Sequence, residues 1–221
     1  MAKMKFKFTI QNYQTEAVNS VVKVFTGQPF QDKVSYRRDT GSQEINTNNR
    51  NVELIESNLF GPDLIESSLF DEELDIGFAN APVALDQHQL LKNIQDVQND
   101  NNIKTSSSLA NHMGVCSLDV EMETGTGKTY VYIKTMFELN KQYGWSKFIV
   151  VVPSIAIREG VQKSFQTMQD HFMEQYGKKA RFFVYNSKNL TDIDNFSSSA
   201  DLSVMIINVQ AFNAGFNKEK N

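Results

Sequence analysis

Three apolar runs separated by helix-like segments constrain the fold of this chain more than any other feature. The runs are KFIVVV at 147–152, RFFVY at 181–185 and LSVMIIN at 202–208. The segment 154–176 is predicted to be a long helix that ends at Gly177. Strands that are apolar on both faces and alternate with helices are typical of a parallel sheet covered by helices on both sides. The sequence therefore predicts an α/β fold.

A glycine-rich loop precedes these runs. It is Glu-Thr-Gly-Thr-Gly-Lys-Thr at 123–129, between a predicted strand, VCSLDVEM at 115–122, and a helix predicted from Thr129 to Tyr143. A strand, a loop ending in Gly-Lys-Thr and a helix form the context of a phosphate-binding loop. Met122 stands where that signature has its first glycine, but this position lies at the end of the strand, before the phosphate-binding turn.

The residue types of the loop suit a nucleotide and Mg²⁺. Gly125 and Gly127 let the backbone turn so that several N–H groups point at anionic oxygens. The amino end of the helix adds a partial positive charge. Lys128 is predicted to reach the β- and γ-phosphates, and the Thr129 hydroxyl to bind Mg²⁺. A purely structural glycine loop is the alternative.

A second magnesium carboxylate is not evident. The apolar runs after residue 129 are followed by Pro153, Asn186 and Asn208, not by an acid. The acidic FDEELD at 70–75 precedes the loop and lacks a strand before it, so a solvated acidic patch is the simpler interpretation. We therefore expect either a fragment or a non-hydrolysing module.

The amino-terminal half divides into three parts. MKFKFTI at 4–10 is predicted to be a strand, residues 12–27 an amphipathic helix, and residues 84–100 a second helix capped by Asp86. Residues 28–84 between them are predicted to be an insertion, which is either a docking element or a solvated loop. Expected domain limits are thus 1–27, 28–84 and 85–221.

Charge is concentrated around this insertion. Residues 41–103 hold 2 Lys/Arg against 12 Asp/Glu, a net charge of −10, whereas the whole chain carries only −4. The insertion also holds a near-repeat, LIESNLF at 54–60 and LIESSLF at 64–70. The remaining, mildly basic body is compatible with nucleic-acid contact without arguing strongly for it.

Composition excludes several classes of protein. The longest apolar run, 148–152, is far too short to span a bilayer, and the amino terminus has no apolar signal region, so no membrane association is expected. Cys116 is the one cysteine, which fits a reducing cytoplasm. His88, His112 and His171 are far apart, and we expect no metal role for them.

Two further features bear on ligands. Pro153 and Ser154 form a turn that opens the helix after the second apolar run, where N–H groups and a hydroxyl suit a DNA or RNA phosphate. A plain strand–helix turn explains the same residues equally well. Gln14 lies at the start of the first helix, and a glutamine amide can pair with adenine N6 and N7.

These segments together resemble a known family. EMETGTGKTYVYIKTMFELNKQYGWSKFIVVVPSIAIREG at 121–160 resembles the Res (restriction) subunit of type III restriction–modification enzymes, within the superfamily-two helicases. NYQTEAVNSVVKVF looks like the family's amino-terminal segment with its adenine-reading glutamine, and VMIINVQAFN looks like the strand before its Asp-Glu-Pro-His motif. The likeness covers about 10–25 and 85–217 and does not extend to the insertion.

The resemblance implies a RecA-like P-loop domain, an α/β lobe with a parallel sheet flanked by helices, that binds ATP and Mg²⁺. Gln14 would read adenine, and Pro153 and Ser154 would touch the DNA backbone. The phosphates would be bound by Thr124, Gly125, Thr126, Gly127, Lys128 and Thr129.

The family's partners are double-stranded DNA and a methyltransferase (Mod) subunit that recognises the site. Its remaining ATPase motifs and nuclease would lie beyond Asn221, so we expect this chain alone to be inactive. A P-loop kinase or GTP switch and a non-hydrolysing nucleic-acid-binding domain remain alternatives.

Overall fold

A parallel three-stranded sheet lies at the centre of the structure, a computed structural model that describes residues 8–32, 34–38, 76–110 and 114–217. Its strands are β3 (Lys147–Val152), β4 (Arg181–Val184) and β5 (Ser203–Asn208), in the order β3-β5-β4. All three run parallel, and both outer strands pair with β5 from Ser203 onward. The predicted α/β fold with a parallel sheet is confirmed.

Helices pack on both faces of this sheet, although Ile149 and Val151 of β3 stay exposed. Side chains alternate across a strand, so neighbouring residues of β4 face opposite sides. The Phe182 ring stacks on Phe165 of α5 (Ile155–Tyr176) at 5.1 Å between centroids, whereas Phe183 meets Phe196 of α6 (Thr191–Ser198) at 5.8 Å. The final helix, α7 (Val209–Asn217), follows β5 and contacts β5 and β3.

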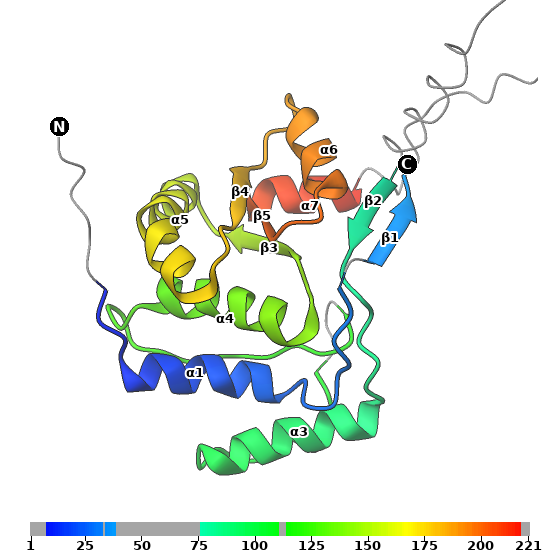
Figure 1. Ribbon diagram of the computed structural model, residues 1–221. Coiled ribbons are helices and arrows are strands. Elements are labelled where there is room, and N and C mark those ends of the chain that lie inside the picture. Colours follow the sequence, from blue (N-terminus) through cyan, green and yellow to red (C-terminus); the bar gives the residue numbers. More distant parts are fainter. Residues whose placement is uncertain (1–7, 33, 39–75, 111–113, 218–221) are drawn as a thin grey trace, which may run out of the picture.

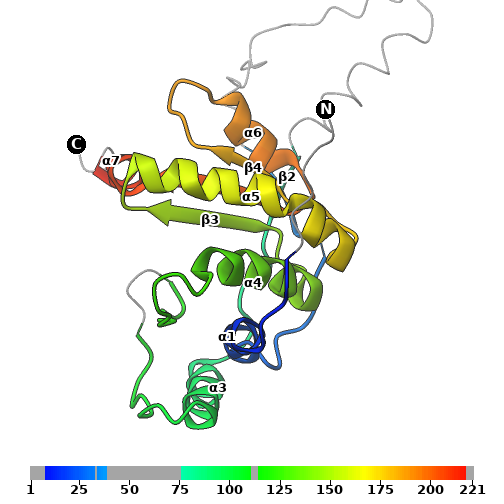
Figure 2. The same cartoon turned by 90° about the vertical axis from the view of Figure 1, so that its left-hand side faces the viewer.

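Helix α4 (Lys128–Tyr143) joins this core to the amino-terminal part of the chain. One side packs with α5, where the rings of Phe137 and Phe172 stack at 4.8 Å. The other side packs on α1 (Asn12–Lys23) through the fully buried Val18. Helix α3 (Gln87–Asp100) lies beyond α1, so α3, α1 and α4 form successive layers below the sheet (Figures 1 and 2). The predicted cap of α3 is confirmed, because the Asp86 carboxylate accepts from the Gln89 N–H at 2.7 Å.

Part of the predicted insertion is an ordered stem. Strands β1 (Val34–Arg37) and β2 (Ile76–Ala79) pair antiparallel, with Val34 opposite Ala79. The Gln28 side chain donates to the Pro82 carbonyl and accepts from the Ala84 N–H, and Asn80 bonds the backbone of Lys147 and Ser146. The sequence analysis did not predict these strands. Both copies of the near-repeat and the acidic FDEELD lie outside the described residues.

The strand predicted at 115–122 is wrong. The segment is extended but pairs with no other strand in the described part of the chain, and it runs along α4 and α1 (Figure 1). Its apolar side chains pack sideways on the helices, Met122 with α1 and α4, and Cys116 and Leu118 with α3. Val115 and Val120 stay 49% and 46% exposed. The alternating pattern therefore reflects a segment with one side buried against the helices. It does not require a neighbouring strand that forms backbone hydrogen bonds.

Two smaller segments complete the fold. The polar residues 190–200 contain α6, whose Phe196 packs on the sheet, and the carbonyls of Phe196 and Ser199 accept from Lys147. Of the strand expected at 4–10, residues 8–10 are irregular and 4–7 lie outside the described residues. Among the described helices, none combines the length and apolar character needed to cross a bilayer.

Candidate functional site

The glycine-rich loop lies directly before α4. Gly125 and Gly127 both have left-handed backbones, with φ of 85° and 90°. Gly127 is the N-cap of α4, and no side chain caps the first N–H groups of the helix. Such N–H groups have no partner within the helix and attract anions. A methyl group added at Gly125 would have nothing within 4 Å, so this side of the loop is open.

Hydrogen bonds inside the loop hold its turn. The Thr126 hydroxyl donates to the Glu123 carbonyl at 2.7 Å. The Lys128 ammonium donates to the carbonyls of Met122 and Glu123, each at 2.9 Å. The lysine therefore folds back over the start of the loop, and its ammonium must leave these backbone oxygens to bind a phosphate.

The first turn of α1 reaches the loop from the other side. The Gln14 side chain donates to the Thr126 carbonyl at 2.9 Å, and the Tyr13 hydroxyl donates to the same oxygen at 3.1 Å. The structure thus brings Gln14 to the loop, 112 residues away in sequence. Sequence reasoning missed Tyr13, although its position next to Gln14 at the start of the helix was the available signal.

The Pro-Ser turn lies at the carboxyl end of β3. That end and the amino end of α4 face the same side of the molecule (Figures 1 and 2). Ser154 is the N-cap of α5, and its hydroxyl accepts from the Ile157 N–H at 3.3 Å. Pro153 and Ser154 are exposed and half-buried respectively. The turn is therefore accessible beside the loop.

The remaining loop residues suit the nucleotide and its metal to different degrees. Thr124 is exposed, and Thr129, in the first turn of α4, is half-buried. Its hydroxyl is one oxygen of the type that Mg²⁺ prefers. Across the described ranges, no three His, Cys, Asp or Glu side chains gather closely enough to bind a metal ion. The described loop therefore offers the Thr129 hydroxyl to a metal ion and no group of carboxylates or imidazoles.

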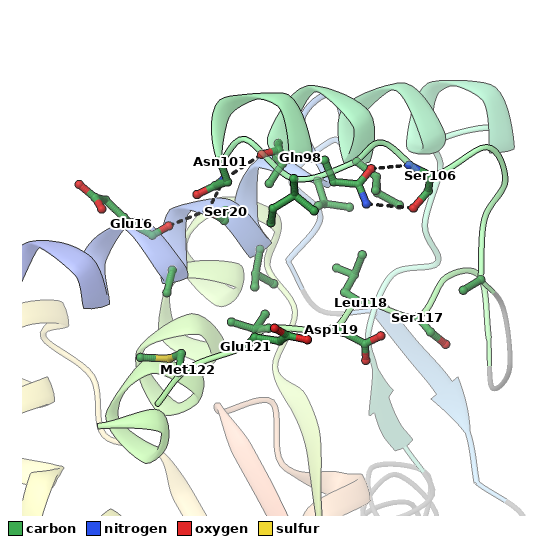
Figure 3. A pocket seen from close by; sticks show the side chains of 18 of the residues that line it. Glu16, Ser20, Gln98, Asn101, Ser106, Ser117, Leu118, Asp119, Glu121 and Met122 are labelled. Carbon is green, nitrogen blue, oxygen red and sulfur yellow. Dashed lines mark hydrogen bonds between the residues drawn. The ribbon is translucent and has the colours of Figure 1, made fainter. Parts of the chain in front are cut away.

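A cavity of about 650 Å³ lies behind the loop, between α1, α3 and the segment 117–123 (Figure 3). Its walls include four carboxylates, those of Glu16, Asp119, Glu121 and Glu123, and none of its described lining residues is Lys or Arg. Like charges repel strongly where water is partly excluded. A polyphosphate is therefore disfavoured in this cavity.

Aromatic packing fixes the amino end of α4. The Tyr130 hydroxyl lies 3.1 Å from His171 Nε2 of α5, and the Tyr130 ring stacks on Phe172. Burial lowers the pKa of His171 and raises the pKa of Tyr130. Both groups are therefore neutral at pH 7, and the helix that presents Lys128 is held rigidly against α5.

The fold and this site define an α/β protein with an anion-attracting glycine loop at the amino end of a helix. Residues 82–221 match the family model of the type III restriction enzyme, res subunit. The chain belongs to this family.

Three relatives of this chain are Res subunits of type III restriction–modification enzymes. The chain is 36% identical over 155 residues to the Res subunit of the type III restriction–modification enzyme EcoP15I of Escherichia coli, which covers 64% of this chain and 16% of that protein. It is 33% identical over 156 residues to the EcoPI Res subunit of Escherichia phage P1, covering 64% and 16%. A shorter match, 48% over 62 residues, links it to the StyLTI Res subunit of Salmonella typhimurium, covering 27% and 6%. The matched region is thus a small part of the length of these relatives.

Proposed function

We propose that this chain forms the nucleotide-binding part of the first RecA-like lobe in a type III restriction enzyme, and that its loop binds MgATP. The observation that carries the proposal is the loop itself. Two positive-φ glycines, an uncapped helix start and the exposed Lys128 occur together in this loop, whose surface is open at Gly125. Backbone N–H groups and a helix amino end form a site for phosphate oxygens.

Two residues, Lys128 and Thr129, have specific roles in this proposal. The Lys128 ammonium exchanges its two backbone carbonyls for β- and γ-phosphate oxygens, which are better partners because they are charged. The Thr129 hydroxyl binds the Mg²⁺ that the phosphates carry. Bound MgATP supplies the hydrolysis energy, and the residues of this chain bind and orient it.

The DNA contact is proposed at the turn after β3. Pro153 and Ser154 are accessible at the same side as the loop, and the backbone at the start of α5 can receive a DNA phosphate. In the complete cytoplasmic enzyme, ATP hydrolysis would drive movement along double-stranded DNA, and cleavage would require the Mod subunit. The printed names of the relatives as Res subunits of type III restriction–modification enzymes support this role.

Two other functions are held as alternatives. A P-loop kinase or GTP switch would use the same loop, whereas a nucleic-acid-binding domain without nucleotide would use only the turn at Pro153 and Ser154. Calorimetric titration with ATP and GTP in the presence of Mg²⁺ separates the three. Preference for ATP together with DNA binding supports the restriction enzyme, preference for GTP supports a switch, and DNA binding without nucleotide binding supports the third.

The direct test is Lys128→Ala in this chain. Loss of a charged hydrogen-bond donor should weaken MgATP binding about tenfold to a hundredfold. Lys141→Ala is the matched control, because Lys141 is an equally exposed lysine near the other end of α4. In the complete enzyme, Lys128→Ala should abolish ATPase activity and DNA cleavage. Unchanged cleavage in that variant would refute the assignment.

A further inference from the structure

Two consecutive side chains of α1 converge on one backbone oxygen of the glycine loop. The Gln14 amide and the Tyr13 hydroxyl both donate to the Thr126 carbonyl, at 2.9 and 3.1 Å. These bonds join the first turn of α1 to the middle of the loop, more than 110 residues away in sequence. Family resemblance alone would assign Gln14 to the base of the nucleotide, so this contact with the loop backbone needs its own explanation.

Gln14 is built into the loop. Its residue is only 9% exposed. A Cβ added at Gly127 would lie 2.5 Å from Gln14 Nε2, so the glutamine occupies the space that a side chain at 127 would need. Gly127 is therefore required twice, once for its φ of 90° and once for the approach of Gln14.

The orientation of the Thr126 carbonyl determines where the next N–H points. A trans peptide group is planar, and its C=O and N–H point in opposite directions. No peptide bond in the described ranges is cis. Because the Thr126 oxygen is held toward α1, the Gly127 N–H of the same peptide group points away from α1.

A loop with two left-handed glycines has alternative conformations in which this peptide group is turned over. Glycine reaches positive and negative φ with nearly equal ease, so a glycine-rich loop loses much conformational entropy when one arrangement is selected. Two hydrogen bonds to one carbonyl oppose that rotation. Lys128 does not supply this restraint, since it bonds Met122 and Glu123 and must leave them when a phosphate binds.

We propose that Tyr13 and Gln14 are positioning residues, a two-donor brace that fixes the Thr126–Gly127 peptide group so that the Gly127 N–H faces the phosphates. The inference rests on the proposed function, because it assumes that the loop binds a polyphosphate. It assigns Gln14 a task that does not depend on the base. The brace predicts that Gln14 contributes to the binding of any triphosphate, including one without a nucleoside.

Inorganic tripolyphosphate with Mg²⁺ is therefore the probe, measured by calorimetry on this chain beside MgATP. Gln14→Met removes both amide donors at nearly constant volume and should weaken tripolyphosphate and ATP by the same factor, about tenfold. Tyr13→Phe should weaken both about threefold, since a more exposed hydrogen bond contributes less. Gln11→Met is the matched control, because Gln11 is exposed one turn earlier, and it should change neither affinity.

The outcomes separate the brace from the proposed function. If Gln14→Met lowers ATP affinity but leaves tripolyphosphate affinity at the wild-type level, Gln14 only reads the base and the brace is refuted. If the wild-type chain binds neither ligand, the proposed function fails and the brace fails with it. Tyr13→Phe keeps the test decisive if Gln14→Met does not fold, because the ring of Tyr13 is 47% exposed and only its hydroxyl is removed. Unchanged tripolyphosphate binding by a folded Tyr13→Phe would count against the brace.

Discussion

The two ends of α4 each have a glycine in the left-handed conformation, but the chain around the two glycines is packed differently. Gly127 before the helix has φ of 90°, and Gly144 after it has φ of 81°. The carboxyl end is closely packed, because a Cβ at Gly144 would overlap the backbone oxygen of Gln31. At the amino end, a Cβ at Gly127 would meet the Gln14 side chain, and open space begins only at Gly125, two residues earlier. The left-handed glycine therefore permits a close approach at both ends of α4, and only the amino end continues into an open loop.

The surroundings of each end explain this difference. Beside Gly144, the Tyr143 hydroxyl donates to the Val22 carbonyl, and the Trp145 indole N–H donates to the Ala81 carbonyl, both from buried positions. These bonds tie α4 to the end of α1 and to the stem. At the amino end, the bonds to Thr126 come from only the first turn of α1. The buried bonds to α1 and the stem are thus at the carboxyl end, and the proposed phosphate-binding surface is at the amino end.

Gly144→Ala should produce the largest loss of stability. The new methyl group meets backbone atoms that cannot easily move, and its residue must adopt a left-handed conformation. We expect a loss of about 3 kcal/mol in the free energy of unfolding, measured by urea denaturation. A loss below about 1 kcal/mol would show that the chain near Gln31 moves aside, and the contrast between the two ends would disappear.

Gly125→Ala should have a smaller effect on stability and a larger one on binding. Its methyl group meets nothing within 4 Å, so only the left-handed strain remains, about 1–2 kcal/mol. The methyl group would instead occupy the surface where phosphate oxygens approach the loop. Denaturation and MgATP titration of the same sample check both parts. Full-strength MgATP binding by this variant would place the phosphates elsewhere.

The smallest effect concerns Lys147, three residues beyond Gly144. Burial lowers its pKa to about 8, with a raising contribution from Asp201 and a lowering one from Arg181. Above pH 8 the folded chain releases this proton before the unfolded chain does, so the unfolded state binds more protons and stability rises with pH. We expect a rise of less than about 1 kcal/mol between pH 8 and 10, because the side chain is only partly buried.

Urea denaturation at pH 7.5 and 9.5 measures this rise, and Lys147→Met should remove it. The rise in stability should end near pH 10. Burial and Glu138 raise the pKa of Tyr176, so near this pH the tyrosine begins to ionise in the unfolded state only, and stability falls again. Burial also raises the pKa of the Cys116 thiol, which lowers wild-type stability as pH rises over the same range, so the effect of Lys147 is taken as the difference between wild type and Lys147→Met. An equal pH dependence of the two proteins would contradict the lowered pKa of Lys147.

Sequence reasoning reached the sheet and the loop for different reasons. The runs at 147–152, 181–185 and 202–208 are apolar on both faces, and this pattern is specific to strands covered on both sides. The loop was recognised because glycines, Lys128 and a following helix have few structural explanations when they occur together. Both predictions depend on local sequence.

The errors came from features that depend on distant partners. Residues 115–122 alternate like a strand, but a strand exists only where another backbone bonds it, and the pattern cannot supply that neighbour. The stem at 34–37 and 76–79 is short, and its ends meet across a long intervening segment, which periodicity does not detect. Tyr13 was missed because a hydroxyl contact with a backbone oxygen far away in sequence leaves no local pattern. The roles assigned to Gln14, Pro153 and Ser154 stay predictions.

The stem has a consequence for how this part of the chain can change. Because Gln28 and Asn80 fasten its two sides to the domain, the points where residues 38 and 76 leave the stem are fixed independently of what joins them. Each doubling of such a connection costs only about 0.6 kcal/mol in loop-closure entropy. A longer connection, or a reporter domain in its place, should therefore leave the geometry at the amino end of α4 unchanged.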